Sequence, residues 1–576
     1  MNRGIAIALL SFFVCITSIF AQPEIPKGWH LLDEAQDSFY GISLNKAYQY
    51  LRSKNKVAQP VIVAVLDSGI DTTHEDLKKN LWHNPKEIPG NGIDDDKNGY
   101  TDDVYGWNFL GGKNGSSIKK ASDERSRVYH RWKSLFDGRI IDTNQLSSAD
   151  KDHYSIWKKA AAGLNFSQEE QTEVMFIELT AKAMKRHDKV IRMEMGKEEY
   201  TCEELEKFDP VTKSGKDAKL GYLTCIKMMG IDSEEKSSGT LNELDEYIEG
   251  KKTSFESKEK EPYNYRAEIV KDNYANFEDR FYGNNDVMGP GPMHGTHVSG
   301  IIGAVRNNDT GIDGVADLVK IMTLRVVPDG DEYDKDVALA IRYAVDQGAK
   351  VINMSFGKSF SPEKSWVDSA VRYAEQHDVL LVHASGNESE DIDVNVNYPN
   401  SWLTQWKIKA GNFITVGASS DLKIGNSIAA DFSNYGKENV DVFAPGVKIY
   451  STLPGGNKYG NLKGTSMATP IVTGLAAMLR SYYPLLNAVE IKKIIEQSVS
   501  IPDTHLSCIK PGINGDPYPF KELCKSGGIV NAYNAVVNAG EIKTVAAPQK
   551  SNNSPKNNNS LKSNNSLNNR NIKLSY

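Results

Sequence analysis

V-I-V-A-V-L-D-S-G, residues 61–69 of a chain of 576, is the stretch that decides the fold class. Its first six residues are apolar and mostly β-branched, they do not alternate with polar residues, and they end at a carboxylate followed by a turn. Such a run is typical of a strand buried on both faces of a parallel sheet. Similar runs occur further along the chain, at residues 319–327, 351–354, 379–383 and 413–416. We therefore expect these segments to be strands of one parallel sheet.

Helical patterns separate these strands. Residues 337–347 and 365–376 carry apolar side chains at the spacing of one helix face. The order strand, helix, strand, helix predicts an α/β fold with a doubly wound parallel sheet and right-handed crossovers. We assign this domain to residues 61–112 and 282–540.

Residues 113–281, between the two parts of this domain, are rich in Lys and Glu. Capping-box patterns at Ser167-x-x-Glu170 and Thr201-x-x-Glu204 predict the starts of helices. We expect a large, mostly helical insertion. Charged helices are usually solvated, so a surface elaboration is the favoured interpretation, and a lid or docking surface beside a cleft is the alternative.

Both ends of the chain differ from the rest in composition. Residues 1–21 join a basic start to an apolar run that ends at Ala21, the layout of a secretory signal peptide, and the run is shorter than the ~20 residues that span a membrane. Residues 22–60 form a short N-terminal extension, and residues 546–576 are an Asn- and Ser-rich tail expected to be disordered. We expect a secreted protein with no membrane span once the signal is removed.

The overall composition is that of an ordinary globular protein, with 39% hydrophobic and 25% charged residues. The formal net charge of -7 argues against a nucleic-acid partner. We expect a monomer.

The cysteines beyond the signal peptide are Cys202, Cys225, Cys508 and Cys524, an even number in a chain bound for an oxidising compartment. Cys508 and Cys524 are close in sequence, which predicts a disulfide between them. Unpaired thiols are the alternative.

Three polar residues stand where side chains reach the carboxyl edge of a parallel sheet. Asp67 ends the first strand, His294 opens H-G-T-H-V-S-G-I-I-G-A, and Ser466 lies in G-T-S-M-A-T-P before the apolar run 471–482. A hydroxyl, an imidazole base and a carboxylate that orients the base are the groups that serine-based acyl transfer needs. Each also has a simpler explanation, since an acid at a strand end is common and Ser466 can cap a helix.

Asn387 follows the apolar run V-L-L-V-H and the turn Ala384-Ser385-Gly386. Its side-chain amide can reach the same edge and, together with the backbone N–H of Ser466, donate to a developing oxyanion. Asn is also common in turns after strands, so a turn residue is the alternative.

His294 and His297 are three residues apart and can also be interpreted as metal ligands. The zinc-protease pattern needs histidines four residues apart around a Glu, whereas Gly295 and Thr296 stand between these two. A zinc site is therefore disfavoured.

The segments D-S-G, H-G-T-H-V-S-G, A-S-G-N and G-T-S-M-A-T-P, in this order, resemble the four signature blocks of the subtilase family. The order Asp, His, Ser differs from that of α/β-hydrolase esterases and of chymotrypsin-like proteases, and the esterase motif G-x-S-x-G is missing. The resemblance implies a subtilisin-like fold and a secreted serine endopeptidase, for which we expect broad specificity. A catalytically inactive binding scaffold is the alternative, and it would require damage at one of the four blocks.

The resemblance also implies a role for each site residue. Asp67 would orient the imidazole, His294 would act as general base and then acid, Ser466 would be the nucleophile, Asn387 the oxyanion donor, and His297 structural.

Substrate would bind as an added, extended β-strand, as peptides often do on a sheet edge. The run after strand 351–354 is similar to the family segment that pairs with the substrate backbone. The expected substrate-binding residues are Ser355, Phe356, Gly357, Ala384, Ser385 and Gly386.

The loop N-G-I-D-D-D-K-N-G-Y-T-D-D-V-Y-G-W-N-F, residues 91–109, concentrates hard oxygen ligands. Their alternation is much like the start of an EF-hand loop, although Tyr105 stands where that loop ends in a bidentate Glu. We expect a structural calcium ion here, and an acidic solvated turn is the alternative. The expected ligands are Asp94, Asp96, Asn98, Tyr100, Asp102 and Asp103.

Overall fold

The computed structural model describes residues 25–229, 236–503, 507–513, 515 and 517–542. The predicted signal peptide and the predicted disordered tail lie outside these residues. Everything described below belongs to the unit of the chain that ends at Glu541.

The centre of the fold is a seven-stranded sheet. In spatial order its strands are β2 (Gly106–Asn108), β3 (Val319–Arg325), β1 (Val61–Asp67), β4 (Val351–Met354), β5 (Leu380–Ala384), β8 (Phe413–Ser419) and β9 (Val442–Pro445). Every neighbouring pair is parallel. All the strands expected from the sequence are therefore confirmed. The sequence analysis missed β2 and β9, because such short runs carry too little pattern.

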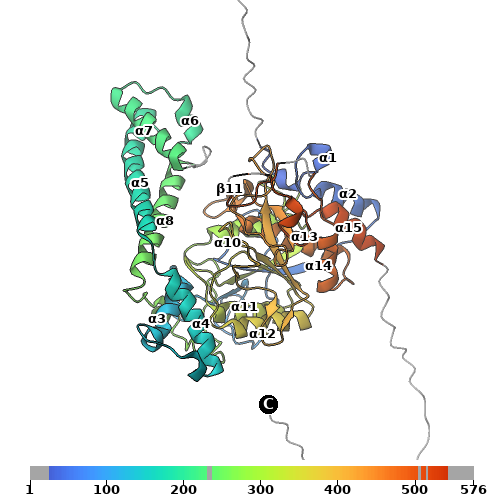
Figure 1. Ribbon diagram of the computed structural model, residues 1–576. Helices are drawn as coiled ribbons and strands as arrows, with labels where there is room; N and C mark the ends of the chain where they lie inside the picture. Colours follow the sequence, from blue (N-terminus) through green and yellow to red (C-terminus); the bar gives the residue numbers. More distant parts are fainter. Residues whose placement is uncertain (1–24, 230–235, 504–506, 514, 516, 543–576) are drawn as a thin grey trace, which may run out of the picture. The chain divides into compact units, whose positions relative to one another are not determined.

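Side chains of β1 alternate between two hydrophobic cores. Val63 and Val65 pack in one core with α10 and α13, whereas Ala64 and Leu66 pack in the other with α11 and α12. Figure 1 shows these helices on the two sides of the sheet, so the predicted doubly wound fold is confirmed. The helices are α10 (Met293–Gly303), α11 (Asp334–Asp346), α12 (Lys364–Gln376) and α13 (Thr465–Tyr482).

The segment before β1 shares the core that contains α10 and α13. Trp29 is fully buried there, and its Nε1 donates to the carbonyl oxygen of Val447 at 3.1 Å. Helix α2 contacts α15. The remaining elements outside the insertion are η1 (Trp29–Leu31), α1 (Glu34–Asp37), α2 (Leu44–Ser53), α14 (Ala488–Gln497), η3 (Phe520–Glu522), α15 (Ala532–Glu541) and the hairpins β6–β7 (Trp402–Leu403, Ile408–Lys409) and β10–β11 (Ile449–Leu453, Lys458–Leu462).

The insertion between β2 and α10 is mostly helical, as expected. Both predicted capping boxes are present, at Ser167 and at Thr201. Helices α5, α7 and α8 lie side by side, and α3 packs against α4 (Figure 1). Its elements are α3 (Glu124–Phe136), η2 (Thr143–Gln145), α4 (Ser148–Gly163), α5 (Gln168–Met195), α6 (Cys202–Lys207), α7 (Lys213–Met229), α8 (Ser237–Glu256) and α9 (Tyr265–Ile269).

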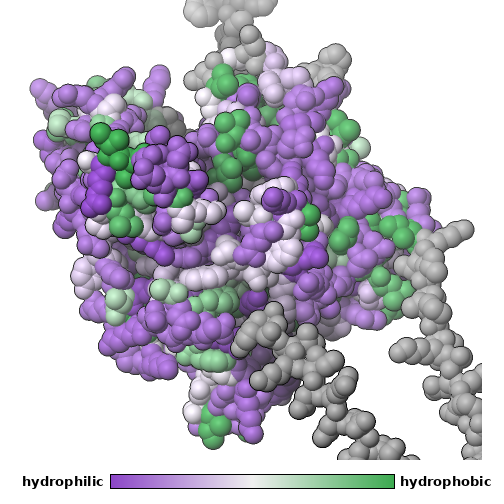
Figure 2. Space-filling view, turned by 60° about the horizontal axis from the view of Figure 1, so that its bottom comes forward, coloured by the Kyte–Doolittle hydropathy of each residue, from purple (hydrophilic) through white to green (hydrophobic). Residues whose placement is uncertain are grey.

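Within the described ranges, no helix is both long enough and apolar enough to cross a membrane. The face of the molecule in Figure 2 is mainly hydrophilic, and its apolar residues form separate small groups. This face therefore shows no large continuous apolar patch among the residues that the structure describes.

The disulfide predicted between Cys508 and Cys524 is wrong, because both residues are free, buried thiols. The sulfur of Cys508 lies 3.9 Å from the carbonyl oxygen of Ile509, and that of Cys524 lies 3.6 Å from Ser526 Oγ. Burial raises the pKa of the Cys508 thiol to about 11, and burial also raises the pKa of Cys524. Proximity in sequence says nothing about whether two side chains point at each other within a core.

Candidate active site

Asp67 and His294 meet at the carboxyl edge of the sheet. Asp67 is the last residue of β1, and His294 is the second residue of α10. His294 Nδ1 lies 2.8 Å from Asp67 Oδ1, and the backbone N–H of Ser68 donates to the same oxygen at 2.7 Å. Only 2% of the Asp67 side chain is exposed. This buried carboxylate therefore holds the imidazole in one orientation.

Gly295 allows α10 to approach the end of β1. A Cβ atom at this position would lie 2.2 Å from the carbonyl oxygen of Gly69 and 3.1 Å from Asp67 Cβ. The first distance is too short for any side chain, because the atom that it would meet belongs to the backbone. The glycine in the H-G-T-H motif is thus required by the close contact that brings His294 to Asp67.

The pKa of His294 results from two opposing effects. Burial lowers the pKa because it disfavours the charged ring, whereas the charge and the hydrogen bond of Asp67 favour that form. The effects of Asp67 prevail, so the pKa of His294 lies above its ordinary value of 6.5. The side chain is still 34% exposed, which leaves the ring accessible to a ligand.

Ser466 is the second residue of α13, and its hydroxyl does not cap the helix. Ser466 Oγ donates to the carbonyl oxygen of Ser355 at 2.9 Å, and Ser355 Oγ donates to the carbonyl oxygen of Ser466 at 3.0 Å. Pro470 has no N–H to bond the Ser466 carbonyl within the helix, so the Ser355 hydroxyl takes that place. The helix begins at Thr465 and its N-cap residue is Gly464, so Ser466 is not the helix cap that the simpler explanation required.

Asn387 lies beside the start of α13. Its Oδ1 accepts from the backbone N–H of Thr465 at 2.8 Å and from the Thr465 hydroxyl at 2.9 Å, which fixes the amide. A Cβ atom on Gly464 would lie 3.6 Å from Asn387 Nδ2 and 3.6 Å from the backbone N of Ser466. The two nitrogens expected to bind an oxyanion therefore both lie next to the position that a side chain on Gly464 would occupy.

The two segments expected to bind substrate lie on either side of Asn397. A Cβ atom on Gly357 would lie 2.8 Å from the Asn397 side-chain amide, and one on Gly386 would lie 3.2 Å from Asn397 Nδ2. Asn397 Nδ2 also donates to the carbonyl oxygen of Ser385 at 2.8 Å. The structure thus brings the segments 355–357 and 384–386 together around a residue that the sequence analysis missed. No local motif marks Asn397.

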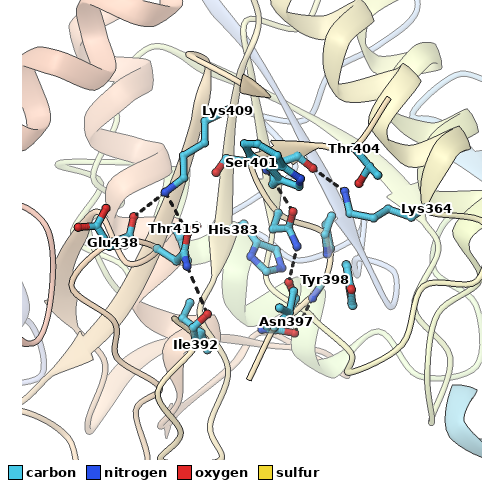
Figure 3. A pocket seen from close by; sticks show the side chains of 15 residues that line it. Lys364, His383, Ile392, Asn397, Tyr398, Ser401, Thr404, Lys409, Thr415 and Glu438 are labelled. Carbon is cyan, nitrogen blue, oxygen red and sulfur yellow. Dashed lines mark hydrogen bonds between the residues drawn. The ribbon is translucent and has the colours of Figure 1, made fainter. Parts of the chain in front are cut away.

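A cavity of about 470 Å³ lies next to Asn397 (Figure 3). His383, in β5, also lines it, and its Nε2 is buried without a hydrogen-bond partner among the described residues. Burial lowers the pKa of His383 to about 3, so the ring is neutral. On another side Lys409 Nζ donates to the Glu438 carbonyl and to Asn439 Oδ1, each at 3.1 Å.

His297 is fully buried. Its Nε2 lies 3.1 Å from the carbonyl oxygen of Gly460 in β11. Burial lowers the pKa of His297 to about 3. The two histidines thus contact different parts of the fold, which fits the structural role expected for His297 and not a shared metal.

The acidic loop brings Asp94 and Asp96 together with Glu87. Ligand atoms of these three carboxylates lie within 4.8 Å of one another, and no other such group of possible metal ligands occurs in the part of the chain that the structure describes. Glu87 was missed because it precedes the loop. Its Oε1 accepts from the backbone N–H of Asp95 at 2.9 Å, and its Oε2 accepts from that of Asp102 at 3.1 Å.

Asp94 and Asp96 accept from backbone N–H groups of the loop, and the other expected ligands also bond to the protein. Asp102 accepts from three backbone N–H groups, and Asp103 accepts from three side chains, including the Tyr343 hydroxyl at 2.5 Å. Burial raises the pKa of Asp103 to about 6. Asn98 Oδ1 accepts from the N–H of Tyr100 at 2.7 Å, and the expected ligand atom of Tyr100 is its carbonyl oxygen.

Comparison with known proteins identifies the family. The model of the subtilase family matches residues 58–522. The chain is 39% identical to a thermophilic serine proteinase of Bacillus sp. (strain AK1), over 42% of this chain and 52% of that protein. It is 42% identical to thermitase of Thermoactinomyces vulgaris, over 35% of this chain and 66% of that protein, and 36% identical to subtilisin BL of Lederbergia lenta, over 36% and 71%.

The chain thus spans 52% and 66% of the length of the first two of these relatives. The family match, in contrast, covers most of the chain and contains Asp67, His294, Asn387 and Ser466. On this match, the protein belongs to the subtilase family.

Proposed function

We propose that this protein is a serine endopeptidase that hydrolyses peptide bonds through an acyl-enzyme. The observation that carries the proposal is the Asp67–His294 hydrogen bond of 2.8 Å, at the sheet edge where Ser466 N and Asn387 Nδ2 both lie next to Gly464. All four residues of the predicted site are intact, so no observation favours an inactive scaffold.

In the proposed first step, neutral His294 takes the proton of Ser466 Oγ as this oxygen attacks the carbonyl carbon of the peptide. The hydroxyl, which donates to the Ser355 carbonyl in the structure, turns toward His294 for this step. Asp67 keeps the ring oriented and stabilises its charged form. The Asn387 amide and the Ser466 N–H donate to the carbonyl oxygen as it becomes negative.

The second half of the cycle uses the same groups. His294 gives its proton to the leaving amine nitrogen, the peptide bond breaks, and the acyl group remains as an ester on Ser466. Water then attacks the ester while His294 accepts its proton, and His294 gives this proton to Ser466 Oγ as the ester bond breaks, which restores the hydroxyl and the neutral imidazole. A raised pKa of His294 means that the neutral form needed for both attacks predominates only above pH 6.5.

The substrate would lie as an extended strand along residues 355–357. Gly357 is exposed, and its N–H and carbonyl make no backbone hydrogen bond to another described residue. Main-chain bonds of this kind are the same for every sequence, so they favour broad specificity. The side chain before the cleaved bond would meet the polar group of Asn397, between the two segments.

We further propose that Glu87, Asp94 and Asp96 hold a structural calcium ion. Three carboxylates within 4.8 Å repel one another unless a cation is present, and their hard oxygens are the ligands that calcium prefers. The ion would supply folding stability and take no part in hydrolysis.

The proposed setting is outside the cytoplasm, where a monomer acts on proteins or peptides. The signal-like composition of residues 1–21 supports export. The molar mass of an inactive variant, measured by light scattering, tests whether the protein is a monomer. Sequencing the N-terminus of the exported protein tests whether the signal peptide is removed.

Covalent labelling tests the endopeptidase. A sulfonyl fluoride should attach to one residue, Ser466, and abolish hydrolysis of a peptide substrate. The Ser466→Ala variant should take no label and lose about 10⁶ in kcat, as for the nucleophile of subtilisin. Intact-mass analysis that finds this variant still labelled at one site would overturn the proposal.

A further inference from the structure

The helical insertion contacts the chain directly after the expected substrate-binding segment. Lys358 follows Gly357, and only 2% of its side chain is exposed. Its Nζ lies 2.8 Å from Glu124 Oε2 of α3, 2.9 Å from Asp334 Oδ1 and 2.7 Å from the carbonyl oxygen of Glu332. A residue of the insertion thus shares a buried ammonium group with the sheet domain.

Glu124 is itself held in place from several sides. Arg127 Nη2 donates to its Oε2 at 2.6 Å, and its backbone N–H donates to Asp331 Oδ2 at 2.7 Å. Burial raises the pKa of Glu124, but attraction by Arg127 and Lys358 prevails and lowers it to about 2. Glu124 therefore remains ionised across the working range of a protease.

Apolar contacts reinforce these ion pairs. Phe360 is 3% exposed and packs with Tyr129 and Trp132 of α3 and with Trp157 of α4. All of these rings come from the insertion except Phe360. Lys358 and Phe360 are the first two buried residues after Gly357. Both contact the insertion.

The backbone of Lys358 carries this contact to the other side of the expected substrate site. Lys358 and Tyr398 exchange two backbone hydrogen bonds, each of 3.0 Å. The neighbour of Tyr398 is Asn397, which bonds the Ser385 carbonyl. The position of Lys358 therefore affects both segments that would face a substrate.

We propose that Glu124 is a positioning residue for the substrate: by holding Lys358, it keeps residues 355–357 aligned to pair with the backbone of an extended peptide. This inference rests on the proposed endopeptidase function. It gives the base of the insertion, by which we mean α3 and α4, a role in substrate binding. The sequence analysis had instead favoured a solvated surface elaboration for the whole insertion. Substrates long enough to pair with residues 355–357 depend on this alignment, whereas a short ester that reaches only Ser466 and the oxyanion donors does not.

The test compares two substrates on Glu124→Gln, a variant that keeps the size of the side chain and removes its charge. For an extended peptide anilide, kcat/KM should fall about tenfold, mainly through KM, since a few main-chain hydrogen bonds are weakened. For a single-residue N-acyl ester, kcat/KM should change less than about twofold, because the acyl-transfer groups are untouched.

Asp272→Asn is the matched control. The side chain of Asp272 is fully buried and accepts from Arg266 Nε at 2.8 Å and from Lys335 Nζ at 2.7 Å, so it also joins the insertion to the sheet domain. It does not bond to Lys358. This variant should lower the melting temperature yet leave the ratio of the two kcat/KM values as in the parent.

Equal losses on both substrates, no loss on either, or the same change of ratio in Asp272→Asn would overturn the inference. If Glu124→Gln does not fold, the double variant Glu124→Gln/Lys358→Met removes both charges of the pair and should show the same selective loss. If the parent protein hydrolyses neither substrate, the proposed function fails instead, and the two failures are thus distinguishable.

Discussion

The central sheet and the outer part of the helical insertion, helices α5 to α8, both have a hydrophobic core, and the outer insertion adds ion pairs on its surface. Val63 and Val65 of β1 are completely buried between helices, and so their positions are fixed by packing. The outer insertion relies in part on exposed ion pairs such as Lys185–Asp245, whose side chains are 45% and 49% exposed. Packing of the first kind holds atoms within the tolerance that catalysis needs, whereas exposed pairs do not. Large functional effects should therefore arise at the sheet edge and small ones in the outer insertion.

The largest effect that tests this contrast is expected for Asp67→Asn at the sheet edge. An amide at this position leaves His294 in the wrong tautomer and should lower kcat by about 10⁴. Neutral His294 is the active form, so the activity of the parent rises with pH through a pKa above 6.5. Without the charge of Asp67, which raises this pKa, the acidic limb of kcat/KM should move to lower pH.

The pH–rate profile of the residual activity measures this shift. Asp71→Asn is the control, because Asp71 lies on the same edge and accepts from Thr73 at 2.9 Å, not from His294. An acidic limb that stays in place in Asp67→Asn, or that moves equally in Asp71→Asn, would contradict the assigned pair.

Asn387→Ala, also at the sheet edge, should lower kcat by about 10² to 10³ and leave KM nearly unchanged, the magnitude known for such a donor in subtilisin. The variant also loses the acceptor for Thr465. Asn387→Asp separates the two roles, since it keeps that acceptor and lacks the N–H donor. Steady-state kinetics should show a comparable loss in both variants, and full activity in Asn387→Asp would leave Asn387 as a turn residue only.

The next prediction concerns calcium binding by the acidic loop. Its expected effect is on the stability of the protein and not on catalysis. In a Ser466→Ala background, calcium at 100 times its Kd should add about 2.7 kcal/mol and raise the melting temperature relative to chelator. Glu87→Gln should lose this response. Asp102→Asn should keep it, because Asp102 is not one of the three carboxylates whose ligand atoms lie within 4.8 Å of one another. Thermal unfolding with and without calcium measures this response. An equal response in the Ser466→Ala parent, in Glu87→Gln and in Asp102→Asn would exclude this site.

The sequence was sufficient to predict those functional residues that lie at the ends of recognisable strands and helices. Asp67, His294 and Ser466 lie at strand ends or helix starts, and the fold of their elements is enough to bring them to one edge. Asn397 and Glu87 could not be found in this way, because their roles depend on contacts with residues from other segments. Asp102 shows the opposite case: its type and spacing fit a metal ligand, yet the carboxylates that lie together are Glu87, Asp94 and Asp96.

The smallest loss of stability is expected for Lys185→Ala in the outer insertion. It is compared with the loss caused by breaking the buried ion pair at the base of the insertion. The pair that it breaks is exposed on both sides, so water and salt screen the charges and the loss should stay below about 1 kcal/mol. Lys358→Met, which leaves buried Glu124 without one of its partners, should instead cost about 3 to 5 kcal/mol. Chemical unfolding of both variants in a Ser466→Ala background measures the difference. Because an exposed pair weakens with ionic strength, the small loss in Lys185→Ala should shrink further at 1 M salt while the larger one persists. Similar losses in the two variants would mean that the base and the outer part of the insertion are held in the same way.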